Sequence, residues 1–122
     1  MIGHYSCAST PYTAYVFWCG DSPYRERGVA EANKIYEDGR WWIARVLVQP
    51  ESMRGRGIGT EMLKRLKREV STKGCTCLQV APGGYDSDPR AISFYKKNGF
   101  VKTKEAGLYE YHFKRKVHKK VP

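Results

Sequence analysis

Three glycines and two arginines are grouped between residues 54 and 60 of this 122-residue chain, in a pattern that favours anion binding. The stretch reads Arg54-Gly55-Arg56-Gly57-Ile58-Gly59-Thr60 and separates an apolar run, 41–48, from an amphipathic segment, 58–70. At the first turn of a helix, unpaired backbone N–H groups meet the positive end of the helix dipole. Glycines let the oxygens of a ligand approach that backbone, and the arginines add full positive charges. We therefore predict a phosphate-binding loop here.

Two common phosphate-loop patterns are excluded by single positions. A Walker loop needs a lysine after its last glycine, but Gly59 is followed by Thr60. A Rossmann fingerprint needs a glycine where this chain has Thr60 or Met62, depending on the glycine from which the count starts. A third pattern, [Gln/Arg]-x-x-Gly-x-[Gly/Ala], is met by Arg54, Gly57 and Gly59. The alternative without ligand binding is a glycine-rich turn that only joins a strand to a helix.

A second segment, Asp88–Phe100, has the features of a short capped helix. Asp88 is a favourable N-cap, Pro89 fits the first helical position, and Gly99 ends the helix. The segment fits the pattern Asn-x-x-Ala-x-x-Phe-Tyr-x-x-x-Gly-Phe at most positions. The matching residues are Ala91, Phe94, Tyr95, Gly99 and Phe100. An ordinary amphipathic helix with a glycine C-cap would contain the same residues.

Taken together, the two patterns resemble those of the GNAT acetyltransferase superfamily, whose signature loop holds the pyrophosphate of acetyl-CoA. The resemblance covers residues 29–113 well and residues 1–28 poorly. It implies an α/β (α+β) fold with a mixed, mostly antiparallel central sheet, a splayed parallel pair of strands, and helices packed on the sheet, as in GNAT-like acyl-CoA N-acyltransferases. It also implies acetyl-CoA as a cosubstrate and no metal.

The resemblance further implies a site between the strands that end at Val48 and Val80. Acetyl-pantetheine would lie in that gap, and an acceptor amine would attack the acetyl carbonyl directly in a ternary complex. Tyr95 matches the tyrosine that protonates the departing CoA thiolate, although it would also serve as a core residue. The implied cofactor-binding residues are Val46, Leu47, Val48, Arg54, Gly55, Arg56, Gly57, Ile58, Gly59, Thr60, Asp88, Ala91, Phe94 and Tyr95.

The sequence departs from the family pattern at two places. Asp88 replaces the usual Asn, which adds a negative charge near the pantetheine arm or only caps the helix. The strand before the loop has no Glu or Asp, where many members place a general base. Glu31 is the nearest substitute and is our candidate catalytic base beside Tyr95, with a water chain as an equal alternative. A surface ion pair with Arg45 is the non-catalytic interpretation of Glu31.

The rest of the chain predicts the elements that hold these segments in place. Apolar and aromatic periodicity predicts strands and helices. Strands are expected over 4–9, 12–19, 29–37, 41–48, 75–80, 100–103 and 108–113, and helices over 58–70 and 89–98. Residues Ile58, Met62, Leu63, Leu66 and Val70 share one helical face. Because a helix connects them, strands 41–48 and 75–80 should be parallel, and residues 81–87 should form a loop.

The dipeptide Asp38-Gly39 favours a tight hairpin turn between strands 29–37 and 41–48. Pairing outward from that turn sets Glu37 opposite Arg40 and Glu31 opposite Val46, so that each pair shares a face of the sheet.

Length and composition predict one domain, 1–113, followed by a basic tail, 114–122. No apolar run is long enough for a membrane span and the N-terminus lacks a secretory pattern, so a soluble, cytoplasmic protein is expected. The four cysteines are interpreted as reduced, partly buried thiols, with a zinc site that also uses His4 and Cys7 as the weaker alternative. The net charge of +10 favours CoA, RNA or an acidic protein surface.

The acceptor is predicted from a missing feature. Helices that build an acceptor wall in longer family members are not indicated between the first two strands, so an open acceptor side is expected. A macromolecular amine fits such a side best: a protein lysine or N-terminal amine, or else the amino group of a charged tRNA. A polyamine is disfavoured by the positive charge. A non-catalytic CoA- or RNA-binding module on the same scaffold is the alternative from another class. No oligomeric state is predicted.

Overall fold

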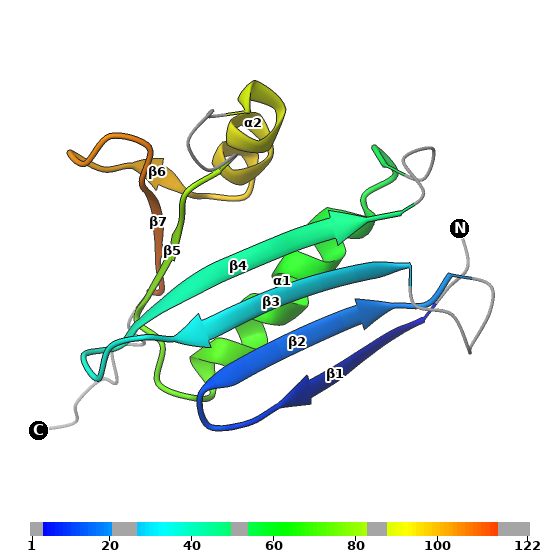
Figure 1. Ribbon diagram of the computed structural model, residues 1–122, viewed down its shortest axis with the longest axis horizontal. Coiled ribbons are helices and arrows are strands. Elements are labelled where there is room, and N and C mark those ends of the chain that lie inside the picture. Colours follow the sequence, from blue (N-terminus) through cyan, green and yellow to red (C-terminus); the bar gives the residue numbers. More distant parts are fainter. Residues whose placement is uncertain (1–3, 21–26, 50–53, 83–87, 115–122) are drawn as a thin grey trace, which may run out of the picture.

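One seven-stranded sheet, with strand order β1-β2-β3-β4-β5-β7-β6, organises the residues that the computed structural model describes, namely 4–20, 27–49, 54–82 and 88–114 (Figure 1). All neighbouring strands are antiparallel except β4 and β5, which are parallel. The predicted fold class is therefore confirmed. The strands are β1 (Tyr5–Ser9), β2 (Thr13–Trp18), β3 (Gly28–Lys34), β4 (Arg40–Val48), β5 (Cys77–Val80), β6 (Val101–Lys102) and β7 (Tyr109–His112), and the helices are α1 (Ile58–Ser71) and α2 (Pro89–Lys97).

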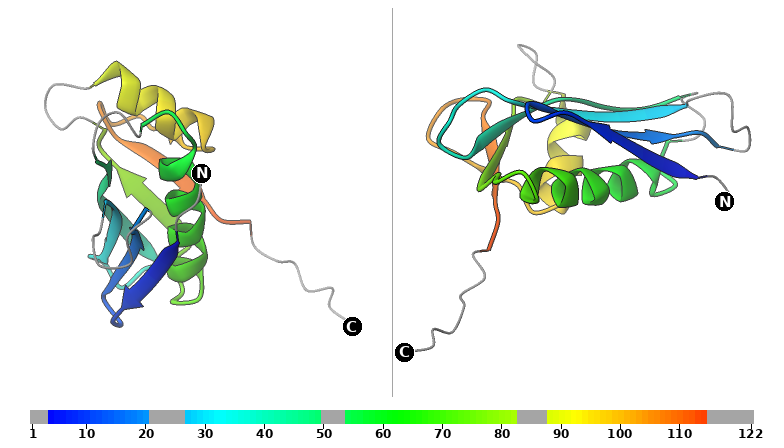
Figure 2. Two further views of the ribbon diagram at one scale, coloured as in Figure 1. Left: turned by 90° about the vertical axis from the view of Figure 1, so that its right-hand side faces the viewer. Right: turned by 90° about the horizontal axis from the view of Figure 1, so that it is seen from below.

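Helix α1 lies along one face of β2, β3 and β4 (Figures 1 and 2) and builds the core there. Its buried residues are those predicted from the periodicity: Ile58, Met62, Leu63, Leu66 and Val70. Three of the buried strand residues in this core, Ala14, Ala30 and Ala32, are small, so the helix can approach the sheet closely there. Burial of one leucine such as Leu66 contributes about 1.5–3 kcal/mol to folding.

Among the described residues, no helix precedes α1 in the chain. Strands β1 and β2 are joined by a short turn in which the N–H of Thr10 donates to the carbonyl of Thr13. Within the described residues, no helix lies on the face of β2–β4 opposite α1 (Figure 2), and the open acceptor side stays a prediction. No helix in the described part of the chain is long and apolar enough to cross a membrane.

The predicted register of the β3–β4 hairpin is wrong by two residues next to the turn and by one residue farther along the strands. Glu31 lies opposite Arg45 instead of Val46, and Asn33 lies opposite Trp42; a β-bulge between Glu31 and Ala32 reduces the offset from two residues to one. The bulge changes which positions of β4 face α1: Trp41 and Ile43 are buried before it, and Val48 after it. Regular alternation from Trp41 would have placed the charge of Arg45 in the core.

The turn of the hairpin is also wider than predicted, since β3 ends at Lys34 and not at residue 37. The carboxylate of Asp38 accepts hydrogen bonds from the backbone N–H of Arg40 at 3.2 Å and from its guanidinium at 2.9 Å. These contacts stabilise a longer turn through Gly39, whose φ of +95° is in the left-handed region.

The parallel pairing of β4 with β5 is short. It runs from Arg40–Cys77 to Trp42–Gln79, after which β4 continues to Val48 without β5 beside it. The two strands diverge visibly in Figure 1. The splayed pair implied by the family resemblance is therefore confirmed. The predicted closing hairpin is confirmed as β6 and β7, and β7 pairs with β5.

Several predicted segments lie outside the described residues. These are most of the loop at 81–87, residues 50–53 before the glycine stretch, and the basic tail after Lys114.

The turn at Gly39 yields a stability prediction. An added Cβ there would lie 2.5 Å from Oγ1 of Thr76, whereas at Gly74, which also has positive φ, it would meet nothing within 4 Å. Gly39→Ala should therefore cost the left-handed strain of about 1–2 kcal/mol plus a steric cost, and Gly74→Ala the strain alone. Thermal unfolding should show the larger decrease in Tm for Gly39→Ala.

Thr76→Ala provides the matched control, because it removes the clashing oxygen. Adding Thr76→Ala to Gly39→Ala should reduce the difference from Gly74→Ala. Equal Tm values for the two single glycine variants would contradict the predicted close approach.

Candidate functional site

A cleft of about 1070 Å³ opens where β4 and β5 separate. It is lined by the second half of β4, the glycine loop, the first turn of α1, the end of β5 and one side of α2. Every predicted cofactor-binding residue except Arg56 lines this cleft. Arg56 is exposed and does not line it, so its role stays a prediction.

The loop end of the cleft presents backbone to a ligand. Gly55 and Gly57 have φ values of +80° and +84°, and an added Cβ would meet nothing within 4 Å at either position. Gly57 is the N-cap of α1 and no side chain caps the helix, so the first-turn N–H groups are not used by a capping side chain. Arg54, also in the lining, donates from Nε to the carbonyl of Val48 at 3.0 Å. The arrangement has the features of an anion site at a helix N-terminus.

Two contacts fix which backbone groups of β4 face the cleft. The N–H of Gln49 donates toward β3 at 2.7 Å, whereas the carbonyl of Val48 accepts from Arg54 in the loop. Successive residues of a strand direct their N–H and C=O groups to opposite edges. Val46 and Val48 therefore offer backbone groups to the cleft, and those of Leu47 point to β3. This narrows the predicted set of backbone partners from three residues to two.

Tyr95 lies deep in the cleft wall. It is 6% exposed and packs edge-on against Phe94 and Phe100, with ring centroids 5.1 and 5.2 Å away. Burial raises the pKa of the Tyr95 phenol far above its ordinary value of 10. The phenol is therefore protonated across the range in which enzymes work and is able to donate a hydrogen bond or a proton. Phe94 also links α2 to α1, since a Cβ on Gly59 would lie 3.4 Å from its ring.

Asp88 performs the capping role that its sequence position predicts. Its Oδ1 accepts a hydrogen bond from the N–H of Arg90 at 2.9 Å, which satisfies one of the free donors at the start of α2. Asp88 is also the one acidic residue among the described residues that line the cleft.

Glu31 is placed outside the cleft lining. Its Oε1 accepts from Nε of Arg45 at 3.0 Å, and its other oxygen accepts from the amide of Asn33 at 3.4 Å. The structure thus contains the ion pair that was the non-catalytic interpretation of this residue. A role of Glu31 as catalytic base stays a prediction that no cleft contact supports.

The sequence analysis missed several polar residues of the site. Arg90, Ser93 and Lys97 all line the cleft from α2, and their spacing of three and four residues places them on one helical face. This spacing is visible in the sequence and predicts that the three side chains share one face of the helix. With Arg45 and Arg54, the lining contains four cationic side chains and one carboxylate. The cleft is therefore suited to a polyanionic ligand that has a long uncharged arm.

Comparison with known proteins agrees with this geometry. Residues 10–100 match the acetyltransferase (GNAT) family, which covers more than half of the chain, so the chain belongs to that family. Membership indicates acetyl transfer from acetyl-CoA, while the acceptor is a separate question. Among curated proteins, the tRNA(Met) cytidine acetyltransferase TmcA 2 of Saccharolobus solfataricus is 34% identical over 61 residues. That match covers 50% of this chain and 7% of the much longer relative.

Solved structures share the fold. PaiA N-acetyltransferase from Thermoplasma acidophilum, in complex with coenzyme A, superposes with a TM-score of 0.69 at 20% identity, covering 84% of this chain and 62% of that one. Gcn5 of Tetrahymena gives a TM-score of 0.67 at 17% identity, covering 87% and 71% of the two chains. At these identities the likeness establishes the architecture.

The unequal placement of the two loop arginines generates a binding prediction. Arg54→Ala should weaken acetyl-CoA binding about 5–30-fold, because it removes a cationic side chain and its contact to β4. Arg56→Ala should change the affinity less than about 3-fold, since Arg56 only adds exposed charge. Isothermal titration calorimetry measures both dissociation constants.

Acetyl-pantetheine, which has no diphosphate, serves as the control ligand, and its affinity should be nearly the same for both variants. If Arg56→Ala has the larger effect on acetyl-CoA, the lining arginine is not the one that holds the diphosphate.

Proposed function

We propose that this chain transfers an acetyl group from acetyl-CoA to a primary amine of a macromolecule, most directly a protein lysine or an N-terminal amine. The observation that carries the proposal is the single continuous cleft that joins the glycine loop to Tyr95 along the unpaired edge of β4. A diphosphate at the loop and a thioester beside a phenol are the two ends of one acetyl-CoA molecule.

The proposed reaction uses both ends of the cleft. The diphosphate is held by the α1 first-turn amides and Arg54, and the backbone of Val46 and Val48 bonds the pantetheine amides. The acceptor nitrogen attacks the acetyl carbonyl and gives up a proton to water. The tetrahedral intermediate then collapses to the amide as the C–S bond breaks. The CoA thiolate then takes the proton of Tyr95, which is replaced from solvent. Proximity of amine and thioester supplies much of the rate.

A macromolecular acceptor is supported by the lack of a described helix over the acceptor side of the site. The turn at Thr10–Thr13 joins β1 to β2 directly, so among the described residues no helical wall encloses the acceptor side. A small substrate would be held by few contacts there. A macromolecule instead obtains its affinity from surface outside the cleft and needs only its amine inside.

A charged tRNA is the second candidate. The tRNA(Met) cytidine acetyltransferase, a partial relative of this chain, supports RNA as the class of acceptor, although its name gives a cytidine and not an aminoacyl group. The net charge of +10 attracts a polyanion such as RNA. In this version the acceptor is the α-amino group of the tRNA-bound amino acid.

The catalytic role of Tyr95 is tested by Tyr95→Phe. This change keeps the ring that packs on Phe94 and Phe100 and removes only the hydroxyl, so kcat should decrease about 10²–10⁴-fold with nearly unchanged affinity for acetyl-CoA. Tyr109→Phe is the matched control, since Tyr109 is equally buried but does not line the cleft. A binding-only module would be indifferent to both substitutions.

The raised pKa of Tyr95 also predicts the pH profile of the wild-type enzyme. Because the acid stays protonated, the rate should increase with pH as the acceptor amine loses its proton, near 8 for an α-amine and near 10 for a lysine. A decrease in rate between pH 8 and 10 would contradict Tyr95 as the acid.

The class of acceptor is tested by incubating the protein with radiolabelled acetyl-CoA and a cell extract. Label transferred to macromolecules should be released by protease and resist ribonuclease if the acceptor is a protein amine. Release by ribonuclease alone would favour the tRNA candidate instead. The Tyr95→Phe variant provides the background, because it retains acetyl-CoA binding under the proposal.

A further inference from the structure

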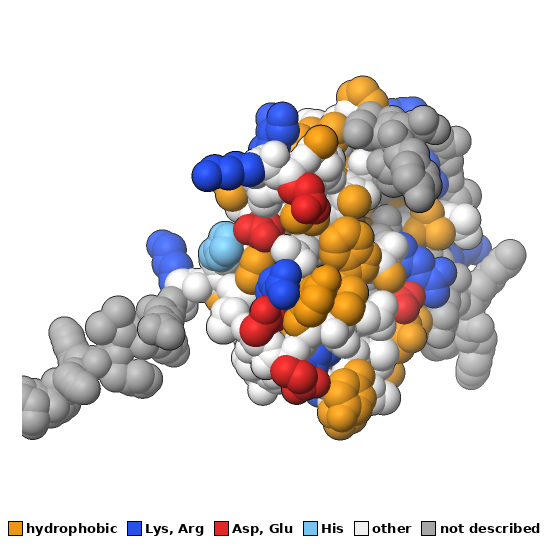
Figure 3. Space-filling model, turned by 60° about the vertical axis from the view of Figure 1, so that its left-hand side comes forward, with side chains coloured by type: hydrophobic (Ala, Val, Ile, Leu, Met, Phe, Trp, Pro, Cys, Tyr) orange, Lys and Arg blue, Asp and Glu red, His pale blue; other side chains and the backbone are white. Residues whose placement is uncertain are grey.

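A second group of chemically capable side chains lies on the neighbouring strands β5 and β7, outside the cleft lining. Cys77 of β5 lies directly opposite His112 of β7, and Glu110 precedes His112 by two residues. Residues two apart in a strand point to the same face, so the three side chains share one face of the sheet. Figure 3 shows a histidine bordered by acidic side chains on this part of the surface.

Close contacts connect these three side chains. Nε2 of His112 is 2.9 Å from Oε1 of Glu110, and the thiol of Cys77 lies close to the same carboxylate. One ligand atom from each residue, a sulfur, a carboxylate oxygen and an imidazole nitrogen, lies within 4.8 Å of the other two. This set of donor atoms is the one that Zn²⁺ prefers in proteins.

We propose that Cys77, Glu110 and His112 form a zinc site that spans β5 and β7, with solvent in the fourth position. Cys77 is 7% exposed, Glu110 is partly exposed and His112 is exposed, so solvent reaches the group from the side of the imidazole. Three protein ligands with one open position are typical of zinc sites that keep a bound water.

Only small movements are needed for coordination. Zinc–ligand bonds of about 2.0–2.3 Å place tetrahedral ligand atoms roughly 3.4–3.8 Å from one another. The ligand atoms lie at most 4.8 Å apart, which exceeds that range by about 1.0–1.4 Å, and the 2.9 Å between Nε2 of His112 and Oε1 of Glu110 is shorter than it. His112 is exposed, and its ring is held only by the contact with Glu110, whereas the backbone of both strands is fixed by the β5–β7 ladder. The required closure is therefore a change of side-chain torsions alone.

A buried amide supports the ligand set from behind. Gln79 is 7% exposed, and its Nε2 donates to the second oxygen of Glu110 at 2.8 Å. This hydrogen bond orients the carboxylate and leaves the first oxygen for the metal, as outer partners do in zinc proteins. Gln79 is the one polar residue that is buried among those described, and orienting Glu110 accounts for its position.

The charges around Cys77 also favour a cation. The carboxylate of Glu110 is the acidic neighbour of the Cys77 sulfur. A divalent ion between them would attract both the carboxylate and the thiolate, and the thiol proton would leave to solvent as the metal–sulfur bond forms. The nearby guanidinium of Arg40 is paired with Asp38 at 2.9 Å and lies 3.7 Å from the ring centroid of Tyr36. The positive charge of Arg40 is thus partly neutralised by Asp38 and lies against the Tyr36 ring.

Cobalt(II) is the probe for this site, because its binding to thiolate gives a charge-transfer band in the near ultraviolet. The full-length reduced protein should bind one Co²⁺ per chain with that band, and Zn²⁺ should displace it. Cys77→Ser and His112→Ala should each abolish the band or weaken binding at least 10-fold. His112→Ala changes an exposed residue, so its fold should be retained, which circular dichroism verifies.

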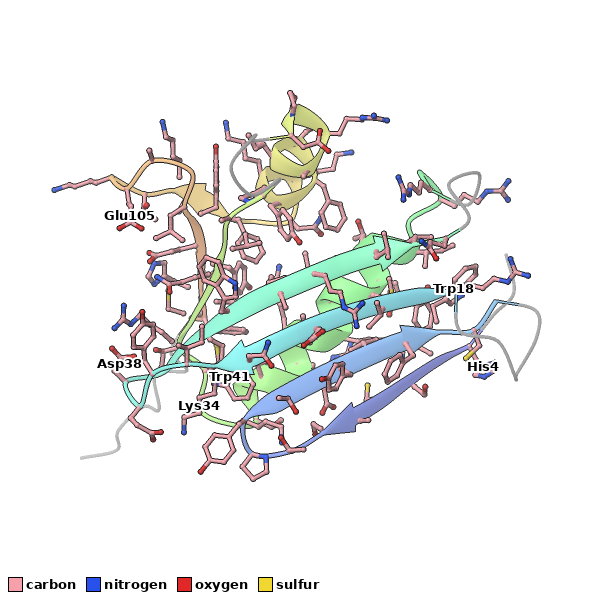
Figure 4. The ribbon with its side chains drawn as sticks, in the orientation of Figure 1. His4, Trp18, Lys34, Asp38, Trp41 and Glu105 are labelled. Atoms are coloured by element: carbon pink, nitrogen blue, oxygen red, sulfur yellow. The ribbon has the colours of Figure 1, made fainter. Side chains whose placement is uncertain are left out.

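Cys7→Ser and His4→Ala are the matched controls. Both residues are exposed. In Figure 4, His4 and Asp38 lie at opposite ends of the sheet, and Asp38 is the labelled residue that is near Cys77. These two variants should keep the wild-type cobalt spectrum and the increase in Tm that Zn²⁺ produces. The proposal is overturned if wild-type protein shows no thiolate band, or if the band survives Cys77→Ser and His112→Ala. Loss of the band in the control variants would assign the metal to a different thiol.

Discussion

The early end of the β4–β5 ladder is the constraint on which the site depends. A parallel strand normally satisfies the edge of its neighbour, yet here the pairing ends at Trp42–Gln79 while β4 continues to Val48. The backbone groups left at that edge must find partners elsewhere, and a buried unpaired amide costs about 1–3 kcal/mol. A ligand that carries amides along its length, such as pantetheine, fits this requirement. The cleft is therefore a place where the sheet is incomplete without its cosubstrate.

Two local features, the β-bulge in β4 and the start of α1, determine which groups lie beside that open edge. The bulge lets Trp41 and Ile43 face the core on one side of it and Val48 on the other, while Arg45 remains outside. Val48 can then pack under the loop while its carbonyl accepts from Arg54. The left-handed Gly57 turns the chain directly into α1, so the helix begins at the cleft instead of behind it.

Local features of this structure could be predicted from the sequence, and features that depend on distant geometry could not. The buried face of α1, the Asp88 cap and the cleft positions of the loop glycines follow from short-range spacing. The predicted hairpin register was wrong because the turn, in which Asp38 binds Arg40, is wider than a two-residue turn. No residue pattern indicates the bulge, which reduces the offset from two residues to one. Arg90 and Lys97 were not predicted, because they are not part of the family pattern, although their spacing places them on one face of α2.

The charge of the cleft bears on the absence of an obvious base. The described lining has four cations, of which Arg45 is paired with Glu31, while Arg54, Arg90 and Lys97 complete the set. Asp88 is its one carboxylate and is already bonded to the helix end. Nearby positive charge disfavours an ammonium ion and so lowers the pKa of an amine that enters the cleft. The cations that attract the diphosphate would thus help to supply the acceptor in its neutral, nucleophilic form. Under this account the base can be solvent. The reaction then does not need Glu31, which lies outside the cleft lining and forms an ion pair with Arg45.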